Sequence, residues 1–104
     1  MEENELNDKL RNSEVDHLFQ AIMSLESVEE CYNFFEDLCT VQELKAMSQR
    51  LTVAKMLSDH KVYSDIVNAT GASTATISRV NRSLLYGNDG YTTVLERLKN
   101  NGKL

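Results

Sequence analysis

The chain has 104 residues, 41% of them apolar, with four glycines and no proline, which predicts a single all-α domain over residues 1–104. It has no run of about 18 apolar residues and no basic-plus-apolar leader, so we expect a cytoplasmic protein without a membrane span or signal peptide. The formal net charge of −5 does not exclude DNA as a partner, because residues 1–44 carry −10 and residues 45–104 carry +5, and DNA binding depends on local potential.

Residues 12–58 are predicted to form three dimerisation helices, after a polar arm over residues 1–11 that has too few apolar residues to pack. Apolar residues at steps of three and four indicate the first two helices, with a break at Glu26 and Ser27. They are Val15, Leu18, Phe19, Ile22 and Leu25, then Val28, Cys31, Tyr32, Phe35 and Leu38. No other Cys or His lies at metal-ligand spacing from Cys31 and Cys39, so we predict buried free thiols, with neither a disulfide nor a metal site.

A long third helix is predicted to follow Thr40, which forms a capping-box pattern with Glu43. Its apolar residues form two stripes, whereas a helix on the flank of a small monomer buries only one stripe against the core. The stripes are Leu44, Met47, Leu51, Ala54 and Leu57, and Val41, Val53 and Met56. We therefore expect this helix to be packed on both sides, with a second copy of the chain covering one side in a homodimer.

Residues 62–85 are predicted to form a helix-turn-helix, with a first helix over Tyr63–Thr70 and a second over Thr74–Leu84. The turn between them has only three residues. Such a reversal favours the left-handed backbone conformation that glycine adopts at low cost, so we expect that conformation at Gly71. Ser73 is placed to cap the second helix.

The second helix of this motif has one apolar and one polar face. The apolar face holds Ile77, Val80 and Leu84, and we expect it to pack against Ile66 and the third helix. The opposite face holds small, hydroxyl-bearing and basic side chains, which suit close approach to the major groove, reading of base edges and phosphate contact. The predicted contacts to double-stranded DNA are Tyr63, Ser64, Ser73, Thr74, Ala75, Ser78, Arg79 and Arg82.

A dense cluster of turn-forming residues from Tyr86 to Gly90 is predicted to end the helix-turn-helix. A last amphipathic helix is predicted over residues 89–100, with Asn88 or Asp89 as its N-cap. Its apolar residues are Tyr91, Val94, Leu95 and Leu98.

Several residues of the third helix and of the helix-turn-helix match a known family. They are Thr40-Val-Gln-Glu-Leu44, Arg50, Gly71-Ala-Ser-Thr-Ala-Thr-Ile-Ser-Arg79, Asn81 and Ser83-Leu84. Over about residues 15–100 the chain resembles the tryptophan-repressor superfamily, and most closely its YerC/YecD-like branch. Val67 and Thr70 depart from the pattern, which keeps a small and an apolar residue there. The six helices predicted for one chain fit this family, and the resemblance implies an intertwined homodimer that regulates transcription, as a repressor. Its recognition helices would lie about 34 Å apart, as in the tryptophan repressor itself.

The resemblance also raises the question of an effector site. Tryptophan repressors hold their corepressor between two arginines, which match Arg50 and Arg79 here, and Thr40 is a further match. Two guanidinium groups and a hydroxyl can bind a carboxylate. In those repressors a glycine after the second arginine lets the indole ring lie against the backbone, whereas this chain has Val80, whose branched side chain obstructs that position. We therefore expect no tryptophan corepressor and no other cofactor, with Arg50 in a salt bridge or phosphate contact and Arg79 on DNA.

Two other classes of function are alternatives to DNA binding. An enzyme is not expected, because His17 and His60 stand alone and the glycines at 87 and 90 flank turn formers instead of forming a phosphate loop. A protein-interaction module is the alternative, in which the acidic helices bind a partner and the helix-turn-helix is only structural. A DNA regulator should lose affinity steeply with added salt, which distinguishes the two.

Overall fold

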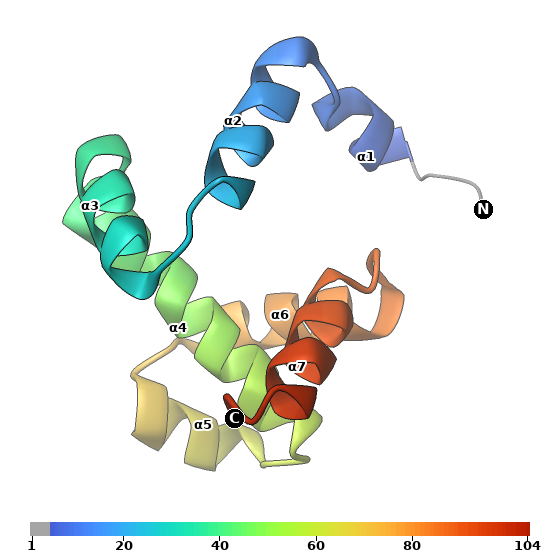
Figure 1. The fold of residues 1–104 in the computed structure, drawn as a ribbon. Helices are drawn as coiled ribbons and strands as arrows, with labels where there is room; N and C mark the ends of the chain where they lie inside the picture. Colours follow the sequence, from blue (N-terminus) through green and yellow to red (C-terminus); the bar gives the residue numbers. More distant parts are fainter. Residues whose placement is uncertain (1–4) are drawn as a thin grey trace. The chain divides into compact units, whose positions relative to one another are not determined.

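The computed structural model describes the backbone of residues 5–104 and the side chains of residues 8–104. This part of the chain is entirely helical, with seven helices and no strand (Figure 1). The helices are α1 Glu5–Leu10, α2 Ser13–Met23, α3 Val28–Leu38, α4 Val41–Ser58, α5 Tyr63–Thr70, α6 Thr74–Tyr86 and α7 Gly90–Asn100. The predicted all-α fold is confirmed. None of the described helices has the length and apolar character that crossing a membrane requires.

The chain divides into two compact units, one ending at Val41 and the other spanning Gln42–Leu104. The prediction of one domain over residues 1–104 stays a prediction.

The first helix of the N-terminal unit is the one that the sequence did not predict. A polar arm is predicted over residues 1–11, whereas Glu5–Leu10 is helical. Residues 1–4 of the predicted arm lie outside the described residues. Glu, Leu and Lys are good helix formers, and Lys9 lies in the last turn, where a positive charge favours the helix dipole. Helix propensity therefore accounts for α1. A helix that forms for this reason needs no repeating apolar residues, so apolar spacing does not predict it.

Side-chain caps fix the starts of α2 and α3. Asn12 Oδ1 accepts a hydrogen bond from the backbone N–H of Val15 at 2.9 Å, and Ser27 Oγ accepts one from the backbone N–H of Glu30 at 3.1 Å. The break predicted at Glu26 and Ser27 is confirmed. However, α2 ends at Met23, so Leu25 lies in the connection and not on the helix face.

The apolar faces of α2 and α3 stay largely uncovered. Neither helix has a fully buried residue, and Met23 and Tyr32 are 84% and 64% exposed. Cys31 and Cys39 are free thiols, as predicted, but only half-buried. The predicted burial is wrong for the chain as described, because no second layer covers this face.

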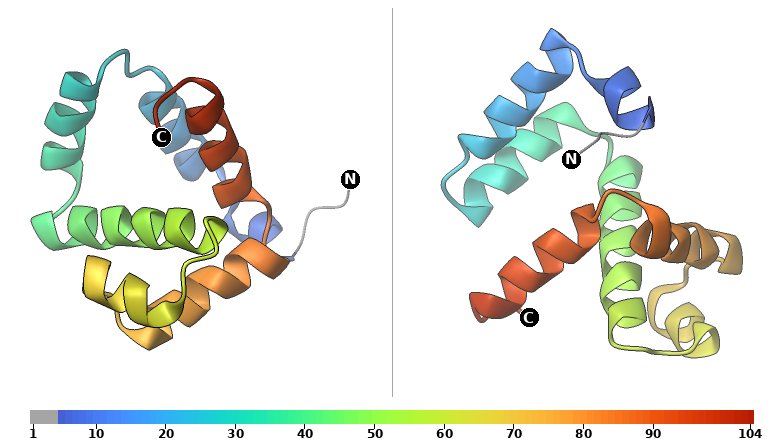
Figure 2. Two further views of the ribbon diagram at one scale, coloured as in Figure 1. Left: turned by 90° about the horizontal axis from the view of Figure 1, so that it is seen from below. Right: turned by 90° about the vertical axis from the view of Figure 1, so that its right-hand side faces the viewer.

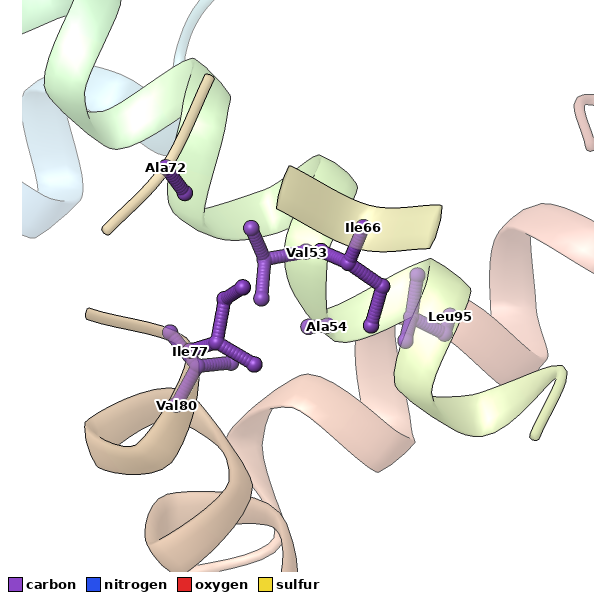
Figure 3. Packing of buried hydrophobic residues seen from close by; sticks show 7 residues of the cluster. All are labelled: Val53, Ala54, Ile66, Ala72, Ile77, Val80 and Leu95. Carbon is purple, nitrogen blue, oxygen red and sulfur yellow. The ribbon is translucent and has the colours of Figure 1, made fainter. Parts of the chain in front are cut away.

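The core of the C-terminal unit lies around the second half of α4. Figure 2 shows α5 and the start of α6 on one side of α4 and α7 on the other. The seven core side chains, none more than 7% exposed, come from α4, α5, the turn, α6 and α7 (Figure 3). They are Val53, Ala54, Ile66, Ala72, Ile77, Val80 and Leu95. Full burial of one such Val, Ile or Leu side chain stabilises the fold by about 1.5–3 kcal/mol.

The two predicted stripes of α4 are both used, but only in its C-terminal half. Val53 comes from one stripe and Ala54 from the other, and both are completely buried. In the N-terminal half, Val41 is 63% exposed and Met47 is 38% exposed, and Leu51, just past the middle of the helix, is also 38% exposed. The helix α4 is therefore packed on both sides only along the part that contacts α5, α6 and α7.

Candidate nucleic-acid interface

The turn between α5 and α6 reverses the chain at Gly71, as predicted. Gly71 has φ 72° and ψ 5°, in the left-handed region, and its N–H donates to the carbonyl oxygen of Val67 at 2.9 Å. A Cβ on Gly71 would meet no atom within 4 Å. The position therefore requires glycine because of its backbone conformation and not for lack of space.

Ser73 caps α6 and fixes its first turn. Its Oγ accepts a hydrogen bond from the backbone N–H of Thr76 at 3.1 Å and donates one to Thr76 Oγ1 at 3.0 Å. Its carbonyl oxygen accepts the backbone N–H of Ile77 at 3.0 Å, the bond that begins the helix. The predicted cap is confirmed, and the hydroxyl of Thr76 is a second, unpredicted part of it.

Two residues that were not predicted to have a role hold the end of α5. Thr70 Oγ1 donates to the carbonyl oxygen of Ile66 at 2.7 Å and accepts the backbone N–H of Ala72 at 3.1 Å. Gln49 Nε2, on α4, donates to the carbonyl oxygen of Thr70 at 3.1 Å. A threonine just before the turn glycine is a local cue for such back-bonding, whereas nothing near Gln49 in the sequence identifies its distant acceptor.

The two faces of α6 differ as predicted. Ile77 is completely buried, Val80 is 2% exposed, and Leu84 is half-buried against the same core. All five residues assigned to the opposite face are exposed: Thr74, Ala75, Ser78, Arg79 and Arg82. One helix therefore presents a continuous surface of small, hydroxyl-bearing and guanidinium side chains.

The three other predicted contacts flank this surface within the same motif. Tyr63 and Ser64 form the first turn of α5 and are exposed, and Ser73 is exposed at the N-cap of α6. Val62, the N-cap residue of α5, makes no side-chain capping bond, so that helix start has no protein side chain as its cap. All eight predicted DNA contacts thus lie exposed on α5, the turn and α6.

Gly87 is the C-cap residue of α6. A Cβ at this position would collide with the carbonyl oxygen of Ser83, so the chain passes too close to α6 for any other residue. Asp89 occupies the N-cap position of α7 with φ 61° but makes no side-chain capping bond. One of the two predicted N-cap residues is therefore at the cap position, without the predicted hydrogen bond.

The residues matched to an effector site are distributed over both units. Arg50 is half-buried on α4 and Arg79 is exposed on α6, whereas Thr40, also exposed, belongs to the N-terminal unit. Arg50 makes no ion pair among the described residues, and its predicted roles in a salt bridge, a phosphate contact or an effector site all stay predictions. Val80, next to Arg79, is in the core.

The structure places both histidines at exposed positions, His17 on α2 and His60 after α4. Among the described side chains, no three of the His, Cys, Asp and Glu type gather as a metal ion would need.

Comparison with known proteins gives one consistent family. The model of the Trp repressor protein family matches residues 13–99. The uncharacterized protein YerC of Bacillus subtilis (strain 168) is 56% identical over 92 residues, which cover 88% of each chain. The predicted resemblance to the tryptophan-repressor superfamily and its YerC branch is confirmed.

Two solved structures share the fold. A candidate Trp repressor from Staphylococcus aureus has 56% sequence identity and a TM-score of 0.86, over 88% of this chain and 92% of that one. A TrpR-like protein from Eubacterium eligens ATCC 27750 has 61% identity and a TM-score of 0.86, over 88% of this chain and 95% of that one.

Proposed function

The chain belongs to the Trp repressor protein family, and from this premise we propose that it is a sequence-specific DNA-binding transcription regulator. It binds operator DNA as a homodimer, with α6 of each copy in the major groove. Repression is the sign of regulation that the family implies. The function requires no catalytic residue, and it suits a cytoplasmic protein, as the sequence predicts.

The observation that carries this proposal is the two-sided character of α6. Ile77 and Val80 hold the helix on the core, and every residue of the opposite face is available to a ligand. At the N-terminal end of that face, Thr74, Ala75 and Ser78 are short enough to let the helix approach base edges. Arg79 and Arg82 follow, where guanidinium groups reach phosphates.

The proposed homodimer is supported by the apolar surface that a single chain leaves open. The helices α2 and α3 carry apolar faces without one buried residue, and the part of α4 before Val53 adds Val41, Met47 and Leu51. Apolar surface of this extent marks an interaction site in a folded protein. A second copy of the same helices would cover it, in line with the family.

We also propose that tryptophan is not the effector. Val80 occupies the position where tryptophan repressors have glycine, and its side chain is part of the core with Ile77 and Val53. Moving it aside for an indole ring would open a cavity in a core of seven residues. Titration calorimetry with free tryptophan should give no binding heat; a micromolar dissociation constant would contradict this part of the proposal.

Selection from a random pool of double-stranded DNA tests the proposed function directly. We expect recovery of a pseudo-palindrome with half-sites one helical turn apart, about 34 Å, and an affinity that falls steeply with salt. Repeating the selection with Thr74→Ala and with Ser78→Ala should change the preferred bases within the half-site. If the chain retains no DNA at low salt, the alternative applies, in which the acidic helices bind a protein partner and the motif is structural.

A further inference from the structure

We propose that Gln49 and Thr70 are positioning residues, which fix the helix-turn-helix on α4 so that α6 is ready for DNA without a small-molecule effector. This inference rests on the proposed function and adds the residues that hold the reading helix in place. Neither residue is among the proposed DNA contacts. Both are half-buried, and both lie in the unit formed by Gln42–Leu104.

Gln49 ties the end of α5 to α4. The last carbonyl groups of a helix have no partner within the helix, and Thr70 is the last residue of α5. Its carbonyl oxygen accepts the side-chain amide of Gln49, which lies 21 residues earlier in the sequence. One side chain therefore satisfies an otherwise unpaired acceptor and also joins two helices that are distant in sequence.

Thr70 joins the end of α5 to the turn. Its hydroxyl donates to the carbonyl oxygen of Ile66 and accepts the N–H of Ala72, so it bridges two residues of the core. Figure 3 shows Ile66 and Ala72 in that core, together with Val53 of α4. An apolar side chain at position 70 could not make this bridge, and the N–H of Ala72 would lose its acceptor.

The direction of α6 depends on this arrangement because Ala72 is followed at once by the cap residue. Ser73 accepts the N–H of Ile77 and so sets the first turn of α6. Loosening Ala72 would let Ser73, and with it the base-reading end of α6, move relative to the core. In this proposal, the side chains of Gln49 and Thr70 order the start of the reading helix before DNA binds.

Four single variants in matched pairs test the inference. Thr70→Val removes the hydroxyl at nearly constant volume, whereas Thr70→Ser keeps it. Gln49→Met removes the side-chain amide from α4, and Gln42→Met makes the same change at an exposed position of that helix.

The first measurement is amide hydrogen exchange in the full-length protein without DNA. Relative to the amide of Leu95 in α7, the amide of Ile77 should exchange about tenfold faster in Thr70→Val and in Gln49→Met. Thr70→Ser and Gln42→Met should match the wild type. The reference to Leu95 separates local loosening of the motif from a loss of global stability.

The second measurement is the ratio of specific to non-specific DNA affinity at fixed salt. We expect this ratio to fall in Thr70→Val and Gln49→Met and to stay unchanged in the two control variants. An unchanged exchange ratio of Ile77 to Leu95 in both variants would overturn the inference. Because exchange is measured without DNA, it decides the inference even if the wild-type chain selects no DNA, a result that contradicts only the proposed function.

Discussion

Ile77 and Arg79, two residues apart on α6, lie on opposite faces of the helix: Ile77 is completely buried, whereas Arg79 is exposed. Two residues turn an α-helix by about 200°, so one side chain can hold the core while the other faces a ligand. Substitutions on the two faces should therefore have separable effects, one on stability and the other on DNA binding.

Replacing Ile77 should destabilise the fold in proportion to the volume removed. We expect Ile77→Ala to lower the free energy of unfolding by about 2–5 kcal/mol and Ile77→Val by about 0.5–1.5 kcal/mol, because each leaves a cavity in the core. Urea denaturation followed by circular dichroism measures both. Val62→Ala, at a residue that is 60% exposed, is the control and should change stability by no more than about 0.5 kcal/mol.

Removing the two exposed guanidinium groups of α6 should weaken binding to all DNA sequences alike. For Arg79→Ala with Arg82→Ala, the slope of log affinity against log salt should become shallower by about two, because each lost phosphate contact contributes about 0.9. Titrations with labelled duplexes at several salt concentrations measure the slope. Arg97→Ala with Lys99→Ala makes the same charge change on α7, and an equal loss there would show that only net charge matters.

Adding a side chain to Gly71 should strain the turn. Gly71→Ala should cost about 1 kcal/mol, because φ 72° lies in the left-handed region even though the added Cβ meets nothing within 4 Å. Gly90→Ala is the matched control: its Cβ is equally free, its φ is not left-handed, and it begins α7. We expect that change to be neutral or to stabilise by about 0.4–1 kcal/mol. Thermal melting should place Gly71→Ala below the wild type and Gly90→Ala at or above it.

A charge on the apolar face of α3 should break the proposed homodimer. Tyr32 is 64% exposed, and Tyr32→Glu would place a carboxylate in the interface, which should raise the dimer dissociation constant about tenfold or more. Asn33→Glu adds the same charge at an exposed polar neighbour and should leave the dimer intact. Sedimentation velocity at micromolar concentration measures both, and a wild-type chain found only as a monomer would contradict the dimer.

The helix-turn-helix could be predicted from the sequence because its determinants are local. The left-handed turn at Gly71, the cap at Ser73 and the buried Ile77 all depend on residues within one or two helical turns of each other. The same rules failed where burial depends on a distant surface. Cys31 and Cys39 have apolar neighbours in sequence, yet they are half-buried because the described chain supplies no layer over them.

The hydrogen bonds of Gln49 and Thr70 are a second feature that the sequence pattern could not predict. Thr70 is a polar residue where the family keeps an apolar one, and its place before Gly71 is a cue only for the local bond to the carbonyl oxygen of Ile66. Its role depends on a turn that brings the N–H of Ala72 to its hydroxyl, and on a glutamine 21 residues away. A pattern of apolar spacing does not specify such long-range polar contacts, since it describes which face is buried and not which acceptor a side chain reaches.

The unbroken helix α4 has a geometric consequence for the proposed homodimer. Its 18 residues span about 27 Å, with Val53 and Ala54 fixed in the core in its second half and Val41 and Met47 open in its first half. With its first half in the proposed dimer interface, α4 sets the distance and the rotation between the dimer axis and the reading helix. One residue inserted between Met47 and Gln49 would turn the reading helix by about 100° and advance it by about 1.5 Å relative to the start of α4, leaving the Gln49–Thr70 hydrogen bond and each motif in place but mismatched to the operator's period.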